Sequence, residues 1–436
     1  MAKLSNPAIR LDGVDQGSLA PLAQGLIGSE VLRIAAEVRA LVAEGRPVCN
    51  LTVGDFDPRE FPLPVALRDG VHRALAAGHT NYPPSNGVME LRKAVVRFIQ
   101  REFGLEYPLE SVLVAGGARP LIYATYRALV APAEHVAYPV PSWNNNHYCY
   151  LTGARGLQIE VSRAANFHPT PEQVRALLPR IRLLALNTPL NPTGTAMDPG
   201  ALAEIARDLV EENARRRAQG ERPVFLMYDQ VYWSLEFDRE LPVTPVGLVP
   251  EVAPYVVMLD AISKSLAATG LRVGWSVAAP PVTQAMSDLL GHVGAWAPKA
   301  EQIATAEFLD DAPAFHAFRL EMHRRLRERL ELLHRELTAL AQRGMPVEAV
   351  APEGTLYLSA RFDLFGKRRA DGTEITTNED IRRLLLHEAG VAVVPFQAFG
   401  LAREDGWMRL SIGSVSPEAI CDGMARLGKV VERLSA

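Results

Sequence analysis

The stretch Val256-Val257-Met258-Leu259-Asp260-Ala261-Ile262-Ser263-Lys264 passes within nine residues from a short apolar run to polar and ionisable side chains. Four other short, mainly apolar runs along the chain end in the same way, and helical patterns separate them. Such runs predict the strands of a largely parallel sheet with helices on both faces, an α/β fold. The other four runs are followed by Gly116-Gly117-Ala118, Pro141-Ser142-Trp143, Asn187 to Gly194, and Asp229 to Tyr232.

The polar ends of these runs are where chemistry is expected. In open α/β sheets, ligands bind beyond the carboxyl ends of the strands. We therefore expect the five ends to converge on one pocket.

The rest of the chain predicts helices and a second, smaller unit. A long helix rich in Arg, Glu and Leu near 313–343 introduces a segment with an α+β pattern. The other expected elements are helices at 29–44 behind an N-cap at Ser29, at about 62–77, 87–103, 120–130, 171–179, 200–218, 378–389 and 416–433, and a strand at 48–53.

Charge and cysteine content exclude several classes of protein. The 46 basic and 50 acidic side chains give a net charge of −4 without long runs of one sign, which disfavours nucleic acid or an anionic membrane as a partner. The three cysteines are scattered, which disfavours a disulfide framework and a thiolate metal site; no metal is expected. With neither a membrane-length apolar run nor a signal-peptide core, a cytoplasmic location is expected.

Lys264 is the candidate nucleophile. The chain has only six lysines, and this one lies among small and apolar neighbours, eight residues before Arg272. A lysine desolvated beside another cation can attack an aldehyde. The alternative is a surface lysine at the start of a helix, its stem lying on apolar neighbours.

Two further strand ends fit a cofactor. Asp229 ends an apolar strand with no basic residue within five positions, so a protonated pyridine nitrogen would supply the missing charge; it could equally cap a helix. Gly117 and Ala118 open a helix and could present backbone N–H groups to a phosphate, although any tight turn uses glycine.

Seven short motifs together resemble a known family. The chain is similar to the class I pyridoxal-phosphate aminotransferases of fold type I over about residues 29–430, and Pro141-Ser142-Trp143 with Asn144 to His147 further resembles aspartate aminotransferases. The motifs are Gly54-Asp55, Asn81-Tyr82-Pro83-Pro84 with Gly87 and Glu90-Leu91-Arg92, Gly116-Gly117-Ala118, Asn191-Pro192-Thr193-Gly194, Asp229 with Tyr232, Ser263-Lys264 with Gly270, Arg272 and Gly274, and Met408-Arg409-Leu410-Ser411.

The resemblance implies a fold and an assembly. The fold would be a large domain at 61–305, with a mainly parallel sheet between helices, and a smaller α+β domain at 306–436 to which residues 1–60 contribute. The protein would be a homodimer in which Tyr82 reaches the site of the other subunit.

The resemblance also implies the role of each site residue. Lys264 would hold pyridoxal 5'-phosphate as a Schiff base and move the substrate's Cα proton, and Arg409 would clamp the α-carboxylate with help from Asn191 and Gly54. The remaining cofactor contacts would be Asp229 to the pyridine nitrogen, Tyr232 and Asn191 to the phenolic oxygen, Trp143 on the ring face, and Gly117, Ala118, Ser263, Arg272 and the partner's Tyr82 to the phosphate.

Some residues depart from the family pattern. Ala118 and Ala261 lack the hydroxyl groups that many relatives place at the phosphate, for which Arg119 could compensate. No arginine lies in 286–302 to hold a distal carboxylate, so the candidates are Arg119, Lys299 and the cluster 144–147.

The resulting hypothesis is an aminotransferase acting on an L-amino acid and a 2-oxo acid, with an acidic pair such as aspartate and 2-oxoglutarate favoured by Pro141-Ser142-Trp143. The alternatives are an aminotransferase of aromatic or branched amino acids, a carbon–sulfur lyase on the same fold, and a pyridoxal-binding regulatory module. A nicotinamide dehydrogenase is disfavoured because no Gly-x-Gly-x-x-Gly follows the first strand.

Overall fold

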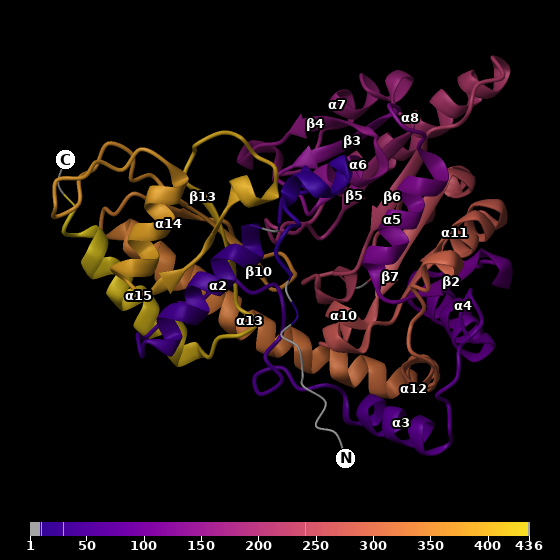
Figure 1. Ribbon diagram of the computed structural model, residues 1–436, viewed down its shortest axis with the longest axis horizontal. Coiled ribbons are helices and arrows are strands. Elements are labelled where there is room, and N and C mark those ends of the chain that lie inside the picture. Colours follow the sequence, from indigo (N-terminus) through magenta and orange to yellow (C-terminus); the bar gives the residue numbers. More distant parts are fainter. Residues whose placement is uncertain (1–8, 10, 29, 240, 435–436) are drawn as a thin grey trace.

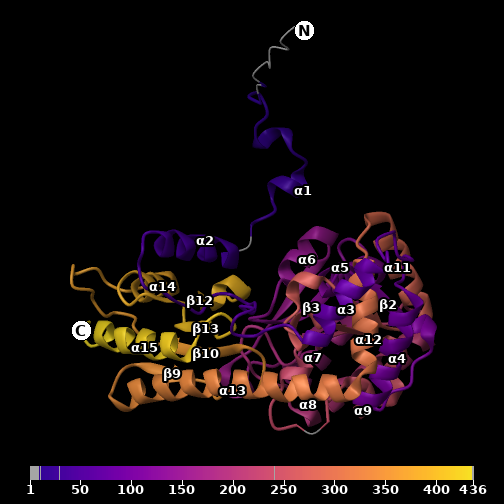
Figure 2. The same ribbon diagram turned by 90° about the horizontal axis from the view of Figure 1, so that it is seen from below.

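The computed structural model describes residues 9, 11–28, 30–239 and 241–434. It contains a larger and a smaller unit, and the long helix α13 (Ala312–Gln342) runs from one to the other (Figures 1 and 2). The N-cap expected at Ser29 lies outside the described residues. The domain limits at residues 60 and 305 stay a prediction.

The larger unit is built on a seven-stranded sheet. All the strands run parallel except β8, which is antiparallel to both of its neighbours. In spatial order the strands are β2 (Val112–Ala115), β8 (Gly274–Val277), β7 (Val256–Ala261), β6 (Phe225–Asp229), β5 (Leu183–Asn187), β3 (His135–Val140) and β4 (Arg155–Glu160).

Alternating side chains of this sheet enter different cores, because successive residues of a strand point to opposite faces. Met227, Val257 and Leu259 pack on one face, where α5 (Ala118–Leu129), α6 (Asn145–Thr152) and α11 (Pro280–Val293) lie. Leu226 and Met258 pack on the other. That other face is covered by α4 (Met89–Phe103), α7 (Pro171–Arg175), α8 (Pro199–Ala218), α9 (Pro245–Leu248) and α12 (Lys299–Asp310).

The smaller unit has an antiparallel sheet in the order β12 (Val394–Pro395), β13 (Trp407–Ser411), β10 (Tyr357–Phe362) and β9 (Val347–Ala349). The C-terminal half of α13 packs there through Leu330, Leu333 and Leu340. Two further helices, α14 (Asn378–His387) and α15 (Pro417–Val431), complete the unit.

The N-terminal segment joins this smaller unit. Helix α2 (Glu30–Ala43) packs Val38 and Leu41 against Leu386 and Ala392. The following strand β1 (Cys49–Asn50) pairs in parallel with β11 (Val391–Ala392). Residues 11–28, with the short helix α1 (Pro21–Gln24), form an exposed arm (Figure 2). The arm contacts the large unit at α6, where Tyr150 Oη donates to the Leu22 carbonyl at 3.0 Å.

The expected elements are present with shifted ends. The strand expected at 48–53 is reduced to two residues, because beyond Leu51 the backbone carbonyls accept hydrogen bonds from side chains instead of a neighbouring strand. Helix α3 (Val65–Ala76) starts only after Pro64. Within the described part of the chain, no helix combines the length and apolar character needed to cross a membrane.

Candidate active site

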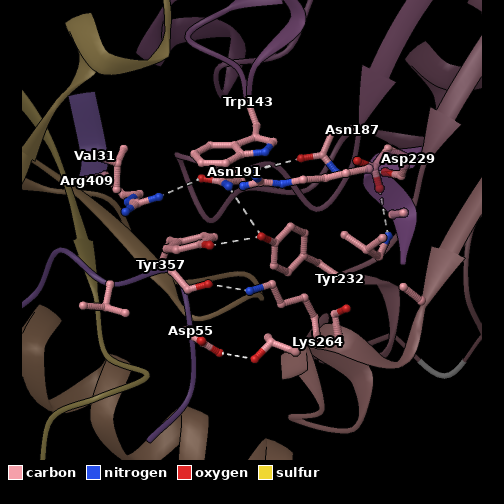
Figure 3. A pocket seen from close by; sticks show the side chains of 18 of the residues that line it. Val31, Asp55, Trp143, Asn187, Asn191, Asp229, Tyr232, Lys264, Tyr357 and Arg409 are labelled. Atoms are coloured by element: carbon pink, nitrogen blue, oxygen red, sulfur yellow. Dashed lines mark hydrogen bonds between the residues drawn. The ribbon is translucent and has the colours of Figure 1, made fainter. Parts of the chain in front are cut away.

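A cavity of about 570 Å³ lies where the two units meet, at the carboxyl ends of β5, β6 and β7 (Figure 3). This volume is within the range of roughly 300–1,000 Å³ that is usual for small-molecule sites. The large unit contributes Asn187, Asn191, Asp229, Tyr232, Ser263, Lys264 and Arg272, the small unit contributes Tyr357 and Arg409, and the segment from α2 onward contributes Val31, Leu32, Ala35 and 52–55.

Lys264 lies at the bottom of this cavity. It belongs to α10 (Ile262–Ser265), a single turn that follows β7 directly, so the strand end determines where the amine points. Its Nζ donates a hydrogen bond to the Gly54 carbonyl and lies 5.9 Å from the centre of the Phe56 ring. The amine is therefore half-buried at the junction of the two units.

Asp229 ends β6 and points into the same cavity. Its Oδ1 accepts a hydrogen bond of 3.2 Å from the Val231 N–H, and burial raises the pKa of the carboxyl to about 6. Among the described residues, no basic side chain forms an ion pair with it. Asp229 is a half-buried carboxylate with room for a cationic group beside it.

A chain of hydrogen bonds crosses from the large unit to the small one. Asn191 Nδ2 donates to Tyr232 Oη at 3.4 Å, and Tyr232 Oη lies 3.0 Å from Tyr357 Oη. Arg409 Nη1 donates to Asn191 Oδ1 at 3.3 Å. Burial raises the pKa of Tyr232 well above its ordinary value, so its phenol keeps its proton at neutral pH.

Arg409 is a fully buried cation, 1% exposed, without an acidic partner among the described residues. Its Nη2 donates to the Thr52 carbonyl, and its Nε has no hydrogen-bond partner among the described residues. The rings of Tyr357 and Phe399 lie 4.7 and 4.9 Å from its Cζ. A buried guanidinium with free donors suits a carboxylate ligand.

The start of α5 forms a second anion-binding region. Gly117 has φ +90°, and a Cβ there would lie 2.4 Å from Arg272 Nη2, so only glycine lets the guanidinium reach this turn. Arg272 donates to the Thr269 carbonyl at 2.8 Å and the Gly116 carbonyl at 3.0 Å. Helix N-terminus and guanidinium together favour a phosphate.

Most residues singled out in the sequence line the cavity. They are Gly54, Ala118, Arg119, Trp143, Asn191, Asp229, Tyr232, Ser263, Lys264, Arg272 and Arg409. Gly117 lies directly against Arg272. Arg119 is exposed, with its guanidinium 5.2 Å from the centre of the Trp143 ring.

Tyr82 lies elsewhere. It is 81% exposed and contacts the Trp296 ring, with ring centres 5.2 Å apart. It does not line the cavity of its own chain.

Sequence reasoning missed several lining residues, among them Thr52, Thr269 and Tyr357. Asn187 was expected at the site because it ends an apolar run, and it lines the cavity. Tyr357 and Thr52 carry no such signal, since each lies in a stretch that reads as ordinary core.

A second carboxylate, that of the buried Asp260, lies behind the cavity. It follows Leu259, the register partner of Asp229, and so points to the opposite face of the sheet. Its Oδ2 accepts from Trp233 Nε1 at 2.8 Å, and its Oδ1 accepts from the Ala261 N–H at 2.7 Å. Burial raises its pKa to about 8.

We expect Asp260→Asn to change how the stability of the cofactor-free protein depends on pH. Because the folded-state pKa of about 8 exceeds the ordinary 3.8, the stability contribution of the protonated carboxyl is complete below pH 4 and is lost as pH rises through 8. Asparagine has no such loss. Urea unfolding across pH 5 to 9 should show the free energy of unfolding of the wild type falling relative to that of the variant, by on the order of several kcal/mol at pH 9.

The matched control is Asp310→Asn, which removes a half-exposed carboxylate paired with Arg97 at 2.6 Å. Its difference from the wild type should stay constant over the same range. Parallel stability curves for Asp260→Asn and the wild type would contradict a buried protonated Asp260.

The fold and this constellation are those of a pyridoxal-phosphate-dependent transferase of fold type I, and the chain belongs to the family described as aminotransferase class I and II, whose model matches residues 46–427. It is an aminotransferase. It is 30% identical to the aspartate aminotransferase of Rhizobium meliloti strain 1021 over 93% of this chain and 94% of the relative. It is also 30% identical to the aspartate/prephenate aminotransferase of Thermus thermophilus, over 94% of this chain and 98% of the relative.

Solved structures agree with the sequence relatives. The crystal structure of the aspartate aminotransferase from Rhizobium meliloti superposes with a TM-score of 0.86 at 28% identity, covering 96% of this chain and 99% of that one. The Thermus thermophilus aspartate aminotransferase with maleate gives 0.83 at 27% identity, covering 94% and 99%.

Proposed function

We propose that this chain binds pyridoxal 5'-phosphate in the cavity and transfers an amino group between an L-amino acid and a 2-oxo acid. One observation carries the proposal. A lysine amine, a carboxylate and a guanidinium from three distant parts of the sequence line one cavity, and the described residues give the carboxylate no cationic partner and the guanidinium no carboxylate. The family uses pyridoxal phosphate. The pyridine nitrogen of this cofactor would pair with the free carboxylate, and the carboxylate of an amino acid would pair with the free guanidinium.

The residues present fit this cofactor. Asp229 would pair with the pyridine nitrogen, Tyr232 and Asn191 would donate to the phenolic oxygen, and Trp143 would lie on the ring face. The Gly117 and Ala118 N–H groups, Ser263 and Arg272 would hold the phosphate, with Arg119 adding a cation where Ala118 and Ala261 lack hydroxyls. When bound, the cofactor supplies an electron sink that stabilises negative charge at the substrate Cα.

The chain's own residues would bind the substrate and move its proton. Arg409 would clamp the α-carboxylate with two parallel N–H donors, while Asn191 and the Gly54 backbone hold its position. Lys264 Nζ, after releasing the cofactor, would take the proton from the substrate Cα and deliver it to the cofactor carbon that had carried the lysine. The substrate is then held between Lys264 and Arg409, so the proton transfer takes place within one complex and needs no further collision.

Charge around the cavity supports an acidic substrate such as aspartate with 2-oxoglutarate. Among the residues that the structure describes, four cationic side chains line it, those of Arg119, Lys264, Arg272 and Arg409, against the two carboxylates of Asp55 and Asp229. Of the candidates for a distal carboxylate, Arg119 alone lines the cavity. Lys299 instead donates to Asn81 Oδ1 at 2.7 Å.

A second candidate is transfer from aromatic or branched amino acids, or a carbon–sulfur lyase reaction. The observation that favours an apolar substrate is the wall formed by Val31, Leu32 and Ala35 of α2. The printed names of the relatives, aspartate and aspartate/prephenate aminotransferase, favour the acidic reading.

We also propose a homodimer in which Tyr82 completes the phosphate site of the other subunit. Its support is the exposure of Tyr82 away from its own cavity and the exposed apolar side chains of the arm, Leu11, Val14 and Ile27. A cytoplasmic location stays a prediction.

The purified protein should be yellow, and each amino acid should be mixed with it separately. We expect aspartate or glutamate to bleach the cofactor band, because the amino group stays on the cofactor when no 2-oxo acid is present. Adding 2-oxoglutarate should restore the colour. A colourless protein that ignores added pyridoxal phosphate would contradict the proposed function, and bleaching by aromatic amino acids alone would select the second candidate.

A further inference from the structure

Tyr357 lies where the two halves of the cavity meet. It begins β10 of the small unit and is 1% exposed. Its hydroxyl lies 3.0 Å from that of Tyr232, and a Cβ on Gly54 would lie only 2.7 Å from it. Its ring lies 4.7 Å from the Cζ of Arg409 (Figure 3). A single side chain thus contacts both the large-unit phenol and the small-unit guanidinium.

The direction of the phenol–phenol hydrogen bond follows from counting protons. Tyr232 has one hydroxyl proton, and under the proposed function it donates that proton to the phenolic oxygen of the cofactor. The Asn191 amide nitrogen can only donate to Tyr232. Tyr357 must then be the donor in its bond with Tyr232, and a hydroxyl that receives a hydrogen bond becomes a stronger donor itself.

The ring of Tyr357 has a separate effect on the substrate clamp. Arg409 has no acidic partner among the described residues, and the rings of Tyr357 and Phe399 both face its guanidinium. Aromatic faces stabilise a cation and restrict the orientation of a planar guanidinium. Tyr357 therefore helps to orient the Arg409 guanidinium that would bind the substrate carboxylate.

We propose that Tyr357 is a positioning residue with two separable effects: its hydroxyl strengthens the hydrogen bond from Tyr232 to the cofactor, and its ring orients Arg409 for the substrate carboxylate. This inference rests on the proposed function, because it requires cofactor and amino acid in the cavity. It adds a residue that joins cofactor binding in the large unit to substrate binding in the small one.

The hydroxyl effect is tested by the colour of the bound cofactor as a function of pH. The phenolic oxygen carries more negative charge once the bound cofactor has lost its proton, so donors to that oxygen lower the pH midpoint of the colour change. Tyr357→Phe in the holoenzyme should raise this midpoint by about 0.5 unit. Tyr232→Phe should raise it more, and adding Tyr357→Phe to Tyr232→Phe should cause no further rise.

The ring effect is tested by substrate affinity. Tyr357→Phe keeps a ring beneath Arg409 and should leave KM within about twofold, whereas Tyr357→Leu should raise KM about tenfold. Tyr357→Leu also lacks the hydroxyl and must show at least the same midpoint shift. The matched control is Tyr228→Phe, which removes a buried hydroxyl bonded to the Val243 carbonyl at 2.9 Å and should change neither quantity.

The outcomes separate this inference from the proposed function. A midpoint shift in Tyr232→Phe without one in Tyr357→Phe would overturn the hydroxyl effect alone. Equal KM values for the Phe and Leu variants of Tyr357 would overturn the ring effect. A wild-type protein with no cofactor band would instead contradict the proposed function.

Discussion

Replacing Lys264 with alanine is expected to lower turnover by at least about 10⁴-fold, because the same amine is the proposed nucleophile and the proposed proton carrier. Cofactor binding should survive, since the contacts proposed for Asp229, Tyr232 and Arg272 do not involve this amine. The variant should hold pyridoxal phosphate non-covalently, and borohydride should then fix no label on the protein. Mass spectrometry of the treated protein and steady-state rates provide the two measurements.

The control for this experiment is Lys93→Ala. Lys93 is an exposed lysine of α4 and does not line the cavity. This variant should keep wild-type rates and should still be labelled at Lys264. Turnover by Lys264→Ala within tenfold of the wild type would contradict the assignment of the amine.

Replacing Arg409 is expected to weaken substrate binding and strengthen the fold. Removing the proposed clamp should lower kcat/KM of Arg409→Ala by about 10²-fold or more, mainly through KM, because truncating one partner of a buried charge pair costs about 2–5 kcal/mol. Unchanged values of both kinetic parameters would show that Arg409 does not bind the carboxylate.

The stability of the cofactor-free protein provides an independent measurement. In the part of the chain that the structure describes, Arg409 is buried without an acidic partner. Arg409→Met, which keeps an apolar chain of similar length, should therefore raise the unfolding temperature. Arg382 is equally buried, yet it pairs with Glu37 at 2.9 Å and with Glu379 at 2.6 Å. Arg382→Met should therefore lower the stability by about 3–5 kcal/mol without raising KM, and an equal loss in both variants would contradict this contrast.

The alternation of apolar runs and helical patterns was enough to predict the large unit. Each run from 112 to 259 is a strand of one sheet, and Asp229 and Lys264 lie at neighbouring strand ends as expected. Strand β8 is the exception in direction, because residues 266–273, between α10 and β8, bring the chain back antiparallel to β7. Local sequence patterns do not carry that information.

The small-unit side of the site was harder to predict. Tyr357 begins a strand whose other residues are buried except Arg361, so its sequence pattern is that of a core residue. Its hydroxyl becomes part of the site only because the fold brings Tyr232, 125 positions earlier in the chain, into contact with it. The carbonyls of Thr52 and Gly54, which accept from Arg409 and Lys264, are backbone groups and leave no signature in residue type.

Helix α13 is packed in both units, so a tilt of this helix would move one unit relative to the other. With 31 residues it is about 46 Å long, at about 1.5 Å per residue, with Phe315 packed in the core beneath the large sheet and Leu340 packed in the small unit. A tilt of one degree about one end displaces the other by about 0.8 Å. The middle turns of α13 are packed as well, with Met322 and Leu326 in the hydrophobic core that also contains Tyr232 and Tyr357. Bending of the helix would therefore change the alignment of the proposed clamp and the amine, which lie on opposite sides of the cavity.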